Sequence, residues 1–340
     1  MKAIVLKRFF FVLVLFCLGS ALLAQPNRQP LQAKQYQPDP QAPWAIVALS
    51  SGNLRVAPDY ESGLDTQLLR GALVQIDSTE RYWEHVTAFE PSYTGWINHL
   101  ALAPLAADEV DAYISAPKYI CTTLVTYVHV LPSTGSPTIC DMVLGDLVRQ
   151  VPSTPASAHS GWVQVLLPSG ECGWVRSTEV ADFKDWAESR QPSAERIIAT
   201  ARRLLGIPYV WGGTTAKGVD CSGLTRTSFL MNGVLLPRDA REQALVGAPV
   251  GLDEEWQPGD LLFFGTPATK TTPMKIGHVA LYIGDGRIIQ SSQLVRINSL
   301  DPSAPDFYDR EVLCVRRILG HIDTGEGVVT VRRSPWYFKQ

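Results

Sequence analysis

Two residues in the second half of this 340-residue sequence could together perform covalent chemistry. Cys221 stands in GVDCSGL (218–224), after a glycine-rich stretch and at the start of a run, 222–231, whose apolar pattern predicts a helix. A cysteine at a helix N-terminus faces unsatisfied backbone N–H groups and the positive end of the helix dipole, and both favour the thiolate. We therefore expect Cys221 to be a nucleophile.

A thiol nucleophile needs a base, and His278 is the histidine best placed to act as one. It is the only one of the six histidines inside the regular pattern of this region, in GHVALYI (277–283), whose alternation predicts a strand. Residues 284–286 (GDG) predict a turn, and 287–291 (RIIQS) predict the partner strand of a hairpin.

The length of the hairpin turn decides which polar residue lies beside His278. A three-residue loop over 284–286 makes Gln290 a diagonal neighbour of His278 on the same face of the sheet. A two-residue Asp-Gly loop places Ser291 on that face instead. The alternation of residues is compatible with both.

A domain that begins near Ser193 must position these residues. Ser193 can cap a helix whose apolar residues follow helical spacing up to Leu205, and Gly206 and Pro208 end it. We therefore expect the catalytic domain over 193–340, and the length of the chain leaves room for further domains ahead of it.

Two similar segments rich in β-branched and aromatic residues precede this domain, at 44–108 and 118–181. The matched pairs are Leu54 with Val128 and Gly71 with Gly145 at an offset of 74 residues, and GWI (95–97) with GWV (173–175) at an offset of 78. The conserved order of these matches along the chain predicts a repeated small β-barrel.

The N-terminal residues predict export. Basic residues up to Arg8 precede an apolar run, 9–18, that is too short to span a membrane and is followed by small residues up to Ala24. This layout predicts a signal peptide over 1–24, and the Gln- and Pro-rich stretch 25–43 predicts a linker. We expect the mature protein in the periplasm or cell envelope, without a membrane span.

Charge and cysteine count narrow the chemistry further. A net charge of −3 provides no basic excess to neutralise phosphates, so no nucleic-acid partner is expected. Five cysteines follow the predicted signal peptide, and an odd number in an oxidising compartment leaves at least one free thiol. A disulfide, if one forms, should join two of Cys121, Cys140 and Cys172. No Cys-x-x-Cys spacing occurs, so neither a metal nor another cofactor is expected.

These motifs resemble known families. DCSG (220–223) and GHV (277–279) resemble the NlpC-type cell-wall peptidases, over about residue 193 to the end, while NLRV (53–56) and GWI (95–97) resemble a bacterial SH3-like domain. The resemblance implies an α+β fold, with a papain-like cysteine peptidase domain preceded by two small SH3-like β-barrels. It also implies that Cys221, His278 and Gln290 are the nucleophile, the general base and the residue that orients the base. The family more often has His in the third position, and a Gln there carries no charge.

Four further residues match family positions that contact the substrate. Trp211, Asp220 and Ser222 would line the groove, and Asp220 would receive the free amine of an N-terminal L-alanine. Tyr93 of the first SH3-like domain would close one end of the groove, with Tyr82 as the alternative.

The implied reaction is hydrolysis of the γ-D-glutamyl to diamino acid bond in peptidoglycan stem peptides, by a monomeric enzyme. Two alternatives stay open. One is a cell-wall amidase or acyltransferase on the same scaffold, because a Cys and His pair does not determine which amide is attacked. The other is a catalytically weak cell-wall binding protein, which the departure at Gln290 would explain.

Overall fold

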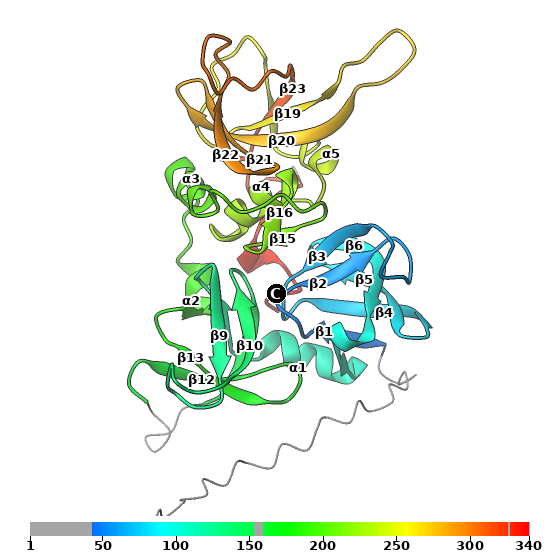
Figure 1. Cartoon of the computed structure of the whole chain (residues 1–340), viewed down its shortest axis with the longest axis vertical. Coiled ribbons are helices and arrows are strands. Elements are labelled where there is room, and N and C mark those ends of the chain that lie inside the picture. Colours follow the sequence, from blue (N-terminus) through cyan, green and yellow to red (C-terminus); the bar gives the residue numbers. More distant parts are fainter. Residues whose placement is uncertain (1–42, 153–158, 326, 340) are drawn as a thin grey trace, which may run out of the picture. The chain divides into compact units, whose positions relative to one another are not determined.

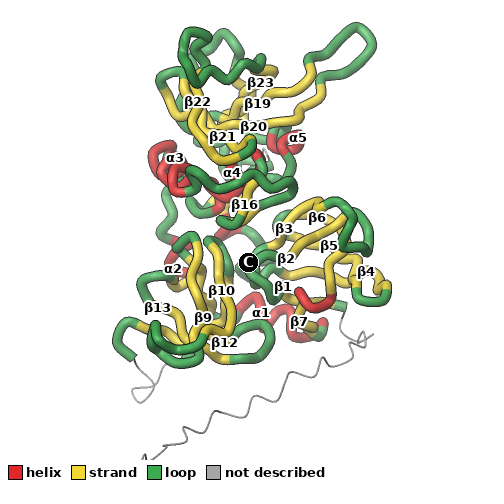
Figure 2. Tube along the Cα trace, in the orientation of Figure 1, coloured by secondary structure: helices red, strands yellow, loops and turns green. Residues whose placement is uncertain are grey.

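The computed structural model describes residues 43–152, 159–325 and 327–339 (Figure 1). The predicted signal peptide and all but the last residue of the predicted linker lie outside these residues. Strands dominate the described chain, and the helices are short (Figure 2). Within the described residues, none of the helices is long and apolar enough to cross a membrane.

The first sheet is antiparallel and has seven strands in the order β3-β2-β6-β5-β4-β1-β7. Its strands are β1 (Trp44–Val47), β2 (Gly52–Arg55), β3 (Leu64–Leu68), β4 (Leu73–Glu80), β5 (Trp83–Phe89), β6 (Ser92–Asn98) and β7 (Leu102–Leu105), with a 3-10 turn η1 (His99–Ala101) before β7. Alternate residues of these strands, among them Leu54, Val86 and Ile97, are fully buried in one small core. This enclosed sheet is the first predicted β-barrel.

The second sheet repeats this topology. After η2 (Ala107–Glu109) and α1 (Val110–Ser115) come β8 (Lys118–Cys121), β9 (Val125–His129), β10 (Thr138–Val143), β11 (Leu147–Gln150), β12 (Trp162–Leu166), β13 (Cys172–Arg176) and β14 (Val180–Asp182). Their order is β10-β9-β13-β12-β11-β8-β14, which is the first order with seven added to each number. Registers match as well, since Arg55 pairs with Trp96 in the first sheet and His129 with Trp174 in the second. The internal repeat predicted from the sequence is therefore present.

The two repeats touch through equivalent glycines. Gly71 and Gly145 both have positive φ, 86° and 93°. A Cβ on Gly71 would lie 2.7 Å from the carbonyl oxygen of Leu147, and one on Gly145 would lie 2.9 Å from Leu69. Only glycine combines this backbone conformation with so close an approach, which explains why both repeats keep it.

The third region combines helices with a six-stranded antiparallel sheet of order β18-β23-β19-β20-β21-β22. Its helices are α2 (Phe183–Glu188), α3 (Ala194–Arg203), α4 (Cys221–Leu230) and α5 (Ala240–Gln243). The sheet strands are β18 (Ala248–Val250), β19 (Leu261–Thr266), β20 (Lys275–Gly284), β21 (Arg287–Ser292), β22 (Leu294–Ser299) and β23 (Val312–Arg317). Short pairs join β15 (Thr214–Thr215) to β16 (Gly218–Val219) and β17 (Val234–Leu235) to β24 (Val329–Thr330), before η3 (Val331–Arg333).

Helix α4 is buried along its whole length although its sequence, CSGLTRTSFL, is half polar. It packs against α3, β20 and β21 on some sides and against β15 and β17 on others. Its polar side chains find partners inside the fold: Thr225 donates to Gln243 at 2.7 Å, and Ser228 donates to the carbonyl of Leu224 at 2.7 Å. A buried helix whose polar side chains are mostly hydrogen-bonded is a rigid support for a residue at its N-terminus.

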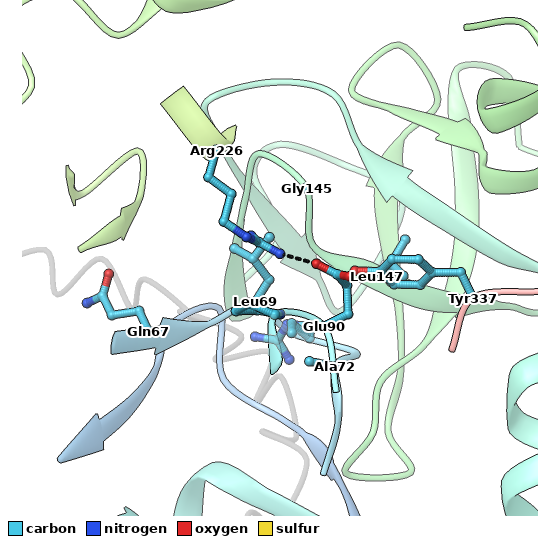
Figure 3. A pocket seen from close by; sticks show the side chains of 10 residues that line it. Gln67, Leu69, Ala72, Glu90, Gly145, Leu147, Arg226 and Tyr337 are labelled. Carbon is cyan, nitrogen blue, oxygen red and sulfur yellow. Dashed lines mark hydrogen bonds and ion pairs between the residues drawn. The ribbon is translucent and has the colours of Figure 1, made fainter. Parts of the chain in front are cut away.

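An ion pair joins α4 to the first barrel. Arg226 lies 2.6 Å from Glu90, in the turn between β5 and β6, and both side chains are largely buried. In Figure 3 the two point toward one another, with Tyr337 beside Glu90. Burial raises the pKa of Glu90, and Arg226 opposes this by stabilising the carboxylate. Because Glu90 precedes Tyr93 by three residues, the pair anchors the hairpin that carries Tyr93.

The C-terminal segment contacts elements of all three regions. Trp336 stacks on Phe89 of the first barrel with ring centroids 4.0 Å apart, and Phe338 stacks on Phe183 of α2 at 5.0 Å. Lys339 lies 2.6 Å from Asp111 in α1. These contacts tie the barrels to the last strand pair of the catalytic region.

Candidate active site

A groove of about 310 Å³ opens where the first barrel meets the catalytic region. Its wall contains Cys221 and each of the predicted substrate residues, namely Tyr93, Trp211, Asp220 and Ser222. Asp65, Tyr209 and Asp239 also line it. The sequence motifs did not indicate these three residues as part of the site.

Cys221 is the first residue of α4, as the sequence predicted. Asp220 is the N-cap, and its side chain accepts a hydrogen bond from the backbone N–H of Gly223 at 2.7 Å. The thiol is buried, with 7% of the residue exposed. Backbone N–H groups of Ser222 and Val279 donate to the sulfur, and Val279 directly follows His278 on β20.

The thiol is not acidified, which corrects the expectation drawn from its place at a helix N-terminus. Burial raises the pKa of Cys221 to about 11, and the neighbouring Asp220 carboxylate raises it further. The two backbone donors and Arg238 act in the opposite direction but are outweighed. The helix N-terminus therefore supplies hydrogen bonds to the sulfur, yet desolvation of the thiolate dominates.

His278 is equally neutral in the resting site. Burial lowers the pKa of His278 to about 4, while a hydrogen bond from its ring to Gln290 and the Asp220 charge raise it in part. Its ring packs against Phe264 and Tyr308, with centroids 5.9 Å and 5.7 Å away. With the thiol and the imidazole both neutral, a proton must leave the thiol during attack, as in general-base catalysis.

The hairpin turn contains two residues, yet Gln290 takes the position expected for a three-residue loop. Asp285 and Gly286 form the turn, both with positive φ, at 51° and 65°. A bulge between Tyr282 and Gly284 then shifts the pairing, so that Leu281 lies opposite Ile289. Continued by one residue, this register sets Ala280 opposite Gln290, and His278 becomes its diagonal neighbour.

Asp220 lines the groove and accepts hydrogen bonds from several protein donors. Its two carboxylate oxygens accept from the guanidinium of Arg238 at 2.7 and 3.2 Å, and from backbone N–H groups of Gly212 at 3.0 Å and Gly223 at 2.7 Å. Ser222 Oγ donates to it as well, at 3.2 Å. A carboxylate offers about four lone-pair sites, so this one is saturated. The expected role of Asp220 as receiver of an ammonium group stays a prediction, and these contacts do not favour it.

Two other carboxylates in the groove retain free capacity. Asp65 receives a hydrogen bond from the hydroxyl of Tyr93 at 3.3 Å, which is its one side-chain partner within the described residues. Asp239 pairs with the exposed Arg241 at 2.9 Å, and its backbone N–H donates to the side chain of Glu242 in a capping box at the start of α5. Arg238, buried to 1% exposure, also donates to Thr66 of β3 at 2.6 Å and so links this wall to the first barrel.

The structure brings Tyr93 rather than Tyr82 to the groove. Burial raises the pKa of Tyr93 above its usual range, so the phenol stays protonated and can donate. Tyr82 is 66% exposed and contacts His99 away from the groove. Trp211 is 70% exposed at the rim, while Ser222 is buried and contacts Asp220 and Arg238.

The cysteines are unpaired in this structure. Cys121, Cys140, Cys172, Cys221 and Cys314 all have free thiols. Among the described residues no cluster of His, Cys, Asp and Glu has the arrangement needed to hold a metal ion.

Comparisons with known proteins identify the family of this chain. Residues 206–317 match the model of the NlpC/P60 family, and residues 54–102 match that of the bacterial dipeptidyl-peptidase Sh3 domain. The dipeptidyl-peptidase 6 of Lysinibacillus sphaericus is 32% identical over 270 residues, which cover 77% of this chain and 93% of that protein. The chain belongs to the NlpC/P60 family.

Other relatives share parts of this NlpC/P60 protein. A γ-D-glutamyl-L-lysine dipeptidyl-peptidase of Bacillus cereus is 36% identical over 156 residues, a match that spans 46% of each protein. The crystal structure of an NlpC/P60 family protein from Bacillus cereus superposes with a TM-score of 0.68 and 26% identity, over 81% of this chain and 99% of that one. The predicted α+β architecture and the class of cysteine peptidase are confirmed.

The neutral resting pair of this NlpC/P60 enzyme leads to a pH prediction. His278 must be unprotonated to accept the thiol proton, and with a pKa lowered to about 4 it stays so well below pH 6.5. With the pKa of Cys221 raised to about 11, no preformed thiolate is lost on acidification. We expect kcat/KM to decline only as the pH falls through about 4 to 5, measured on a short peptide. An acid limb at pH 6.5 or above, with the protein still folded, would contradict this.

Proposed function

We propose that this protein hydrolyses the γ-D-glutamyl to diamino acid bond of peptidoglycan stem peptides that begin with a free L-alanine. The observation that carries the proposal is the first barrel's contribution to the catalytic groove, because Asp65 and Tyr93 line the same cavity as Cys221. A groove closed by a carboxylate and a phenol at one end suits a short peptide with a charged N-terminus. The name of one relative, γ-D-glutamyl-L-lysine dipeptidyl-peptidase, supports the same bond, and that of another, dipeptidyl-peptidase 6, supports the release of a dipeptide.

The chemistry follows from the neutral pair. Cys221 attacks the γ-glutamyl carbonyl carbon as His278 takes the thiol proton, and a thioester forms when His278 returns that proton to the leaving amine. Water, deprotonated by the same imidazole, then attacks the thioester carbonyl and restores the thiol. The backbone N–H of Cys221 can stabilise the oxyanion, because the first residues of a helix have no intrahelical partner for their N–H groups.

The ammonium subsite that we propose consists of three side chains that line the groove. The carboxylates of Asp65 and Asp239 would pair with the ammonium group, and the Tyr93 hydroxyl would contact the substrate. Unlike Asp220, these carboxylates are not saturated by protein donors. Two residues, L-alanyl and γ-D-glutamyl, would fill the space from this end to the thiol. We also propose that the protein acts as a monomer outside the cytoplasm, in keeping with the predicted signal peptide and with peptidoglycan as substrate.

The bond can be tested by product analysis. Purified protein incubated with L-alanyl-γ-D-glutamyl-L-lysine and with its diaminopimelate analogue should release the dipeptide and the free diamino acid. N-acetylmuramyl-L-alanyl-γ-D-glutamyl-L-lysine serves as the matched control, because its alanyl nitrogen is acylated. Release of the muramyl group from its peptide would instead identify an amidase. If the folded protein hydrolyses neither compound, the result would support the alternative of a cell-wall binding protein.

A further inference from the structure

Two buried polar atoms of the active site, one on His278 and one on Gln290, each lack a hydrogen-bond partner. Nε2 of His278 and Oε1 of Gln290 are both inaccessible to solvent, and neither makes a well-formed hydrogen bond with any described residue. One can donate and the other can only accept. The hydrogen bond with Gln290 raises the pKa of His278, as expected when an acceptor stabilises the protonated ring. The geometry therefore requires a proton on Nε2, which leaves Nδ1 of the neutral ring free to act as the base.

An amide can present either of two ends, so something must hold Gln290 with its oxygen toward His278. The side chain of Gln290 is fully buried, and its Nε2 donates to Oδ1 of Asn298 at 2.9 Å. If the amide turned over, two N–H donors would confront each other at His278 and two oxygens would confront each other at Asn298. Burial makes each such mismatch costly, at about 1 to 3 kcal/mol for an unsatisfied group.

The polarity of Asn298 is set by the main chain. Its Nδ2 donates to the backbone carbonyl of Asp306 at 2.8 Å, and a carbonyl can only accept. The amide nitrogen of Asn298 must therefore face Asp306, and its oxygen must face Gln290. The carbonyl of Asp306 thus fixes the orientation of the Asn298 amide, which in turn fixes that of the Gln290 amide. The oxygen of Gln290 then faces Nε2 of His278.

The three side chains follow a diagonal across adjacent strands. Ile288 on β21 lies opposite Asn298 on β22, and Gln290 lies opposite Arg296, so Gln290 and Asn298 are diagonal neighbours on one face. His278 on β20 has the same relation to Gln290 on the other side. The relay is thus built on three rigid strands.

We propose that Asn298 is a positioning residue that holds the His278 imidazole in the tautomer with its proton on Nε2, acting through the amide of Gln290. Asn298 has no contact with the thiol or with the groove wall. This inference rests on the proposed roles of Cys221 and His278, and it adds the residue that determines which nitrogen of the base is free. In this chain the relay does what a charged or ionisable third residue does elsewhere in the family, because a neutral Gln needs a neighbour to fix its orientation.

The main test is a double-mutant cycle read by both kinetics and NMR. Asn298→Leu removes the acceptor that orients Gln290 and should lower kcat by about 10-fold to 100-fold with little change in KM, by analogy with the loss of outer partners of metal-bound histidines. In a Gln290→Leu background the same substitution should cause almost no further loss. Equal losses in both backgrounds would show that Asn298 acts only on the fold and would overturn the proposal.

Tautomers of His278 can be observed directly from the ¹⁵N shifts of its ring, without substrate. Native protein should show the proton on Nε2, and Asn298→Leu should transfer a substantial fraction to Nδ1. Asn298→Asp keeps an acceptor for Gln290 and should preserve the native tautomer. Arg287→Gln, which breaks a surface ion pair to Asp306, is the matched control and should leave the tautomer unchanged.

The two readouts separate failure of this inference from failure of the proposed function. If the peptide is not cut but the tautomer responds to Asn298→Leu as expected, the relay stands and the substrate is wrong. If the peptide is cut and the tautomer of His278 is the same in native protein and Asn298→Leu, the relay is wrong.

Discussion

Cys221→Ala should lower peptide hydrolysis by about 10⁴-fold or more, as loss of the nucleophile does in other hydrolases with covalent intermediates. The fold should survive, because Ala is a good helix former and the cap at Asp220 is untouched. Only the sulfur is lost from a site in contact with the groove, so the free energy of unfolding should change by about 1 kcal/mol.

Cys314→Ala is the matched control for this variant. Cys314 is another free thiol of the catalytic region, on β23, and it lies outside the groove. It should keep full activity. Both variants should unfold at denaturant concentrations close to that of the native protein. Retained hydrolysis by a folded Cys221→Ala protein would refute the assignment of the nucleophile.

Acetylation of the substrate's N-terminus should lower kcat/KM by about 100-fold. The free ammonium would be desolvated between Asp65 and Asp239, and removing its charge removes the substrate cation that these carboxylates would pair with. Breaking a buried ion pair costs on the order of 3 kcal/mol or more. Because each factor of ten in kcat/KM corresponds to about 1.4 kcal/mol, this cost corresponds to about 100-fold. The measurement compares one tripeptide with a free and with an acetylated nitrogen.

Variants show whether the first barrel is responsible for this preference. Asp65→Asn should reduce the preference for the free amine by about 10-fold, because a neutral amide still accepts a hydrogen bond but no longer pairs with a charge. Asp108→Asn, an exposed carboxylate of the linker after the first barrel, should have no effect. Equal turnover of free and acetylated peptides by native protein would exclude a closed groove and favour an enzyme of the intact wall.

The residue pattern predicted where the chemistry is but not how it is tuned. Alternation along β20 placed His278 on a strand, and the repeat offsets predicted two barrels of one topology. The position of Gln290 could not be obtained from alternation, because the outcome depends on a bulge at Gly284 that compensates for the two-residue turn. A single extra residue in one strand changes the face of every side chain beyond it.

The role of Asp220 shows a second limit. Its place before Cys221 is evident in the sequence, and so is Arg238, but only the fold brings the two within 2.7 Å. Their pairing makes Asp220 a buried support of the helix N-terminus. The sequence also does not predict the raised pKa of Cys221. A local motif indicates donors to the sulfur, but it does not show how far solvent is excluded from the thiol.

The most direct test of the account is mass analysis of the acyl-enzyme. L-alanyl-γ-D-glutamyl-L-lysine is mixed with the protein, the reaction is stopped in acid within the first turnover, and the modified residue is found by peptide mapping. The account predicts a thioester on Cys221 that carries the L-alanyl-γ-D-glutamyl group and no lysine. An adduct on another residue, or a Cys221 adduct that carries L-alanine alone, would contradict it.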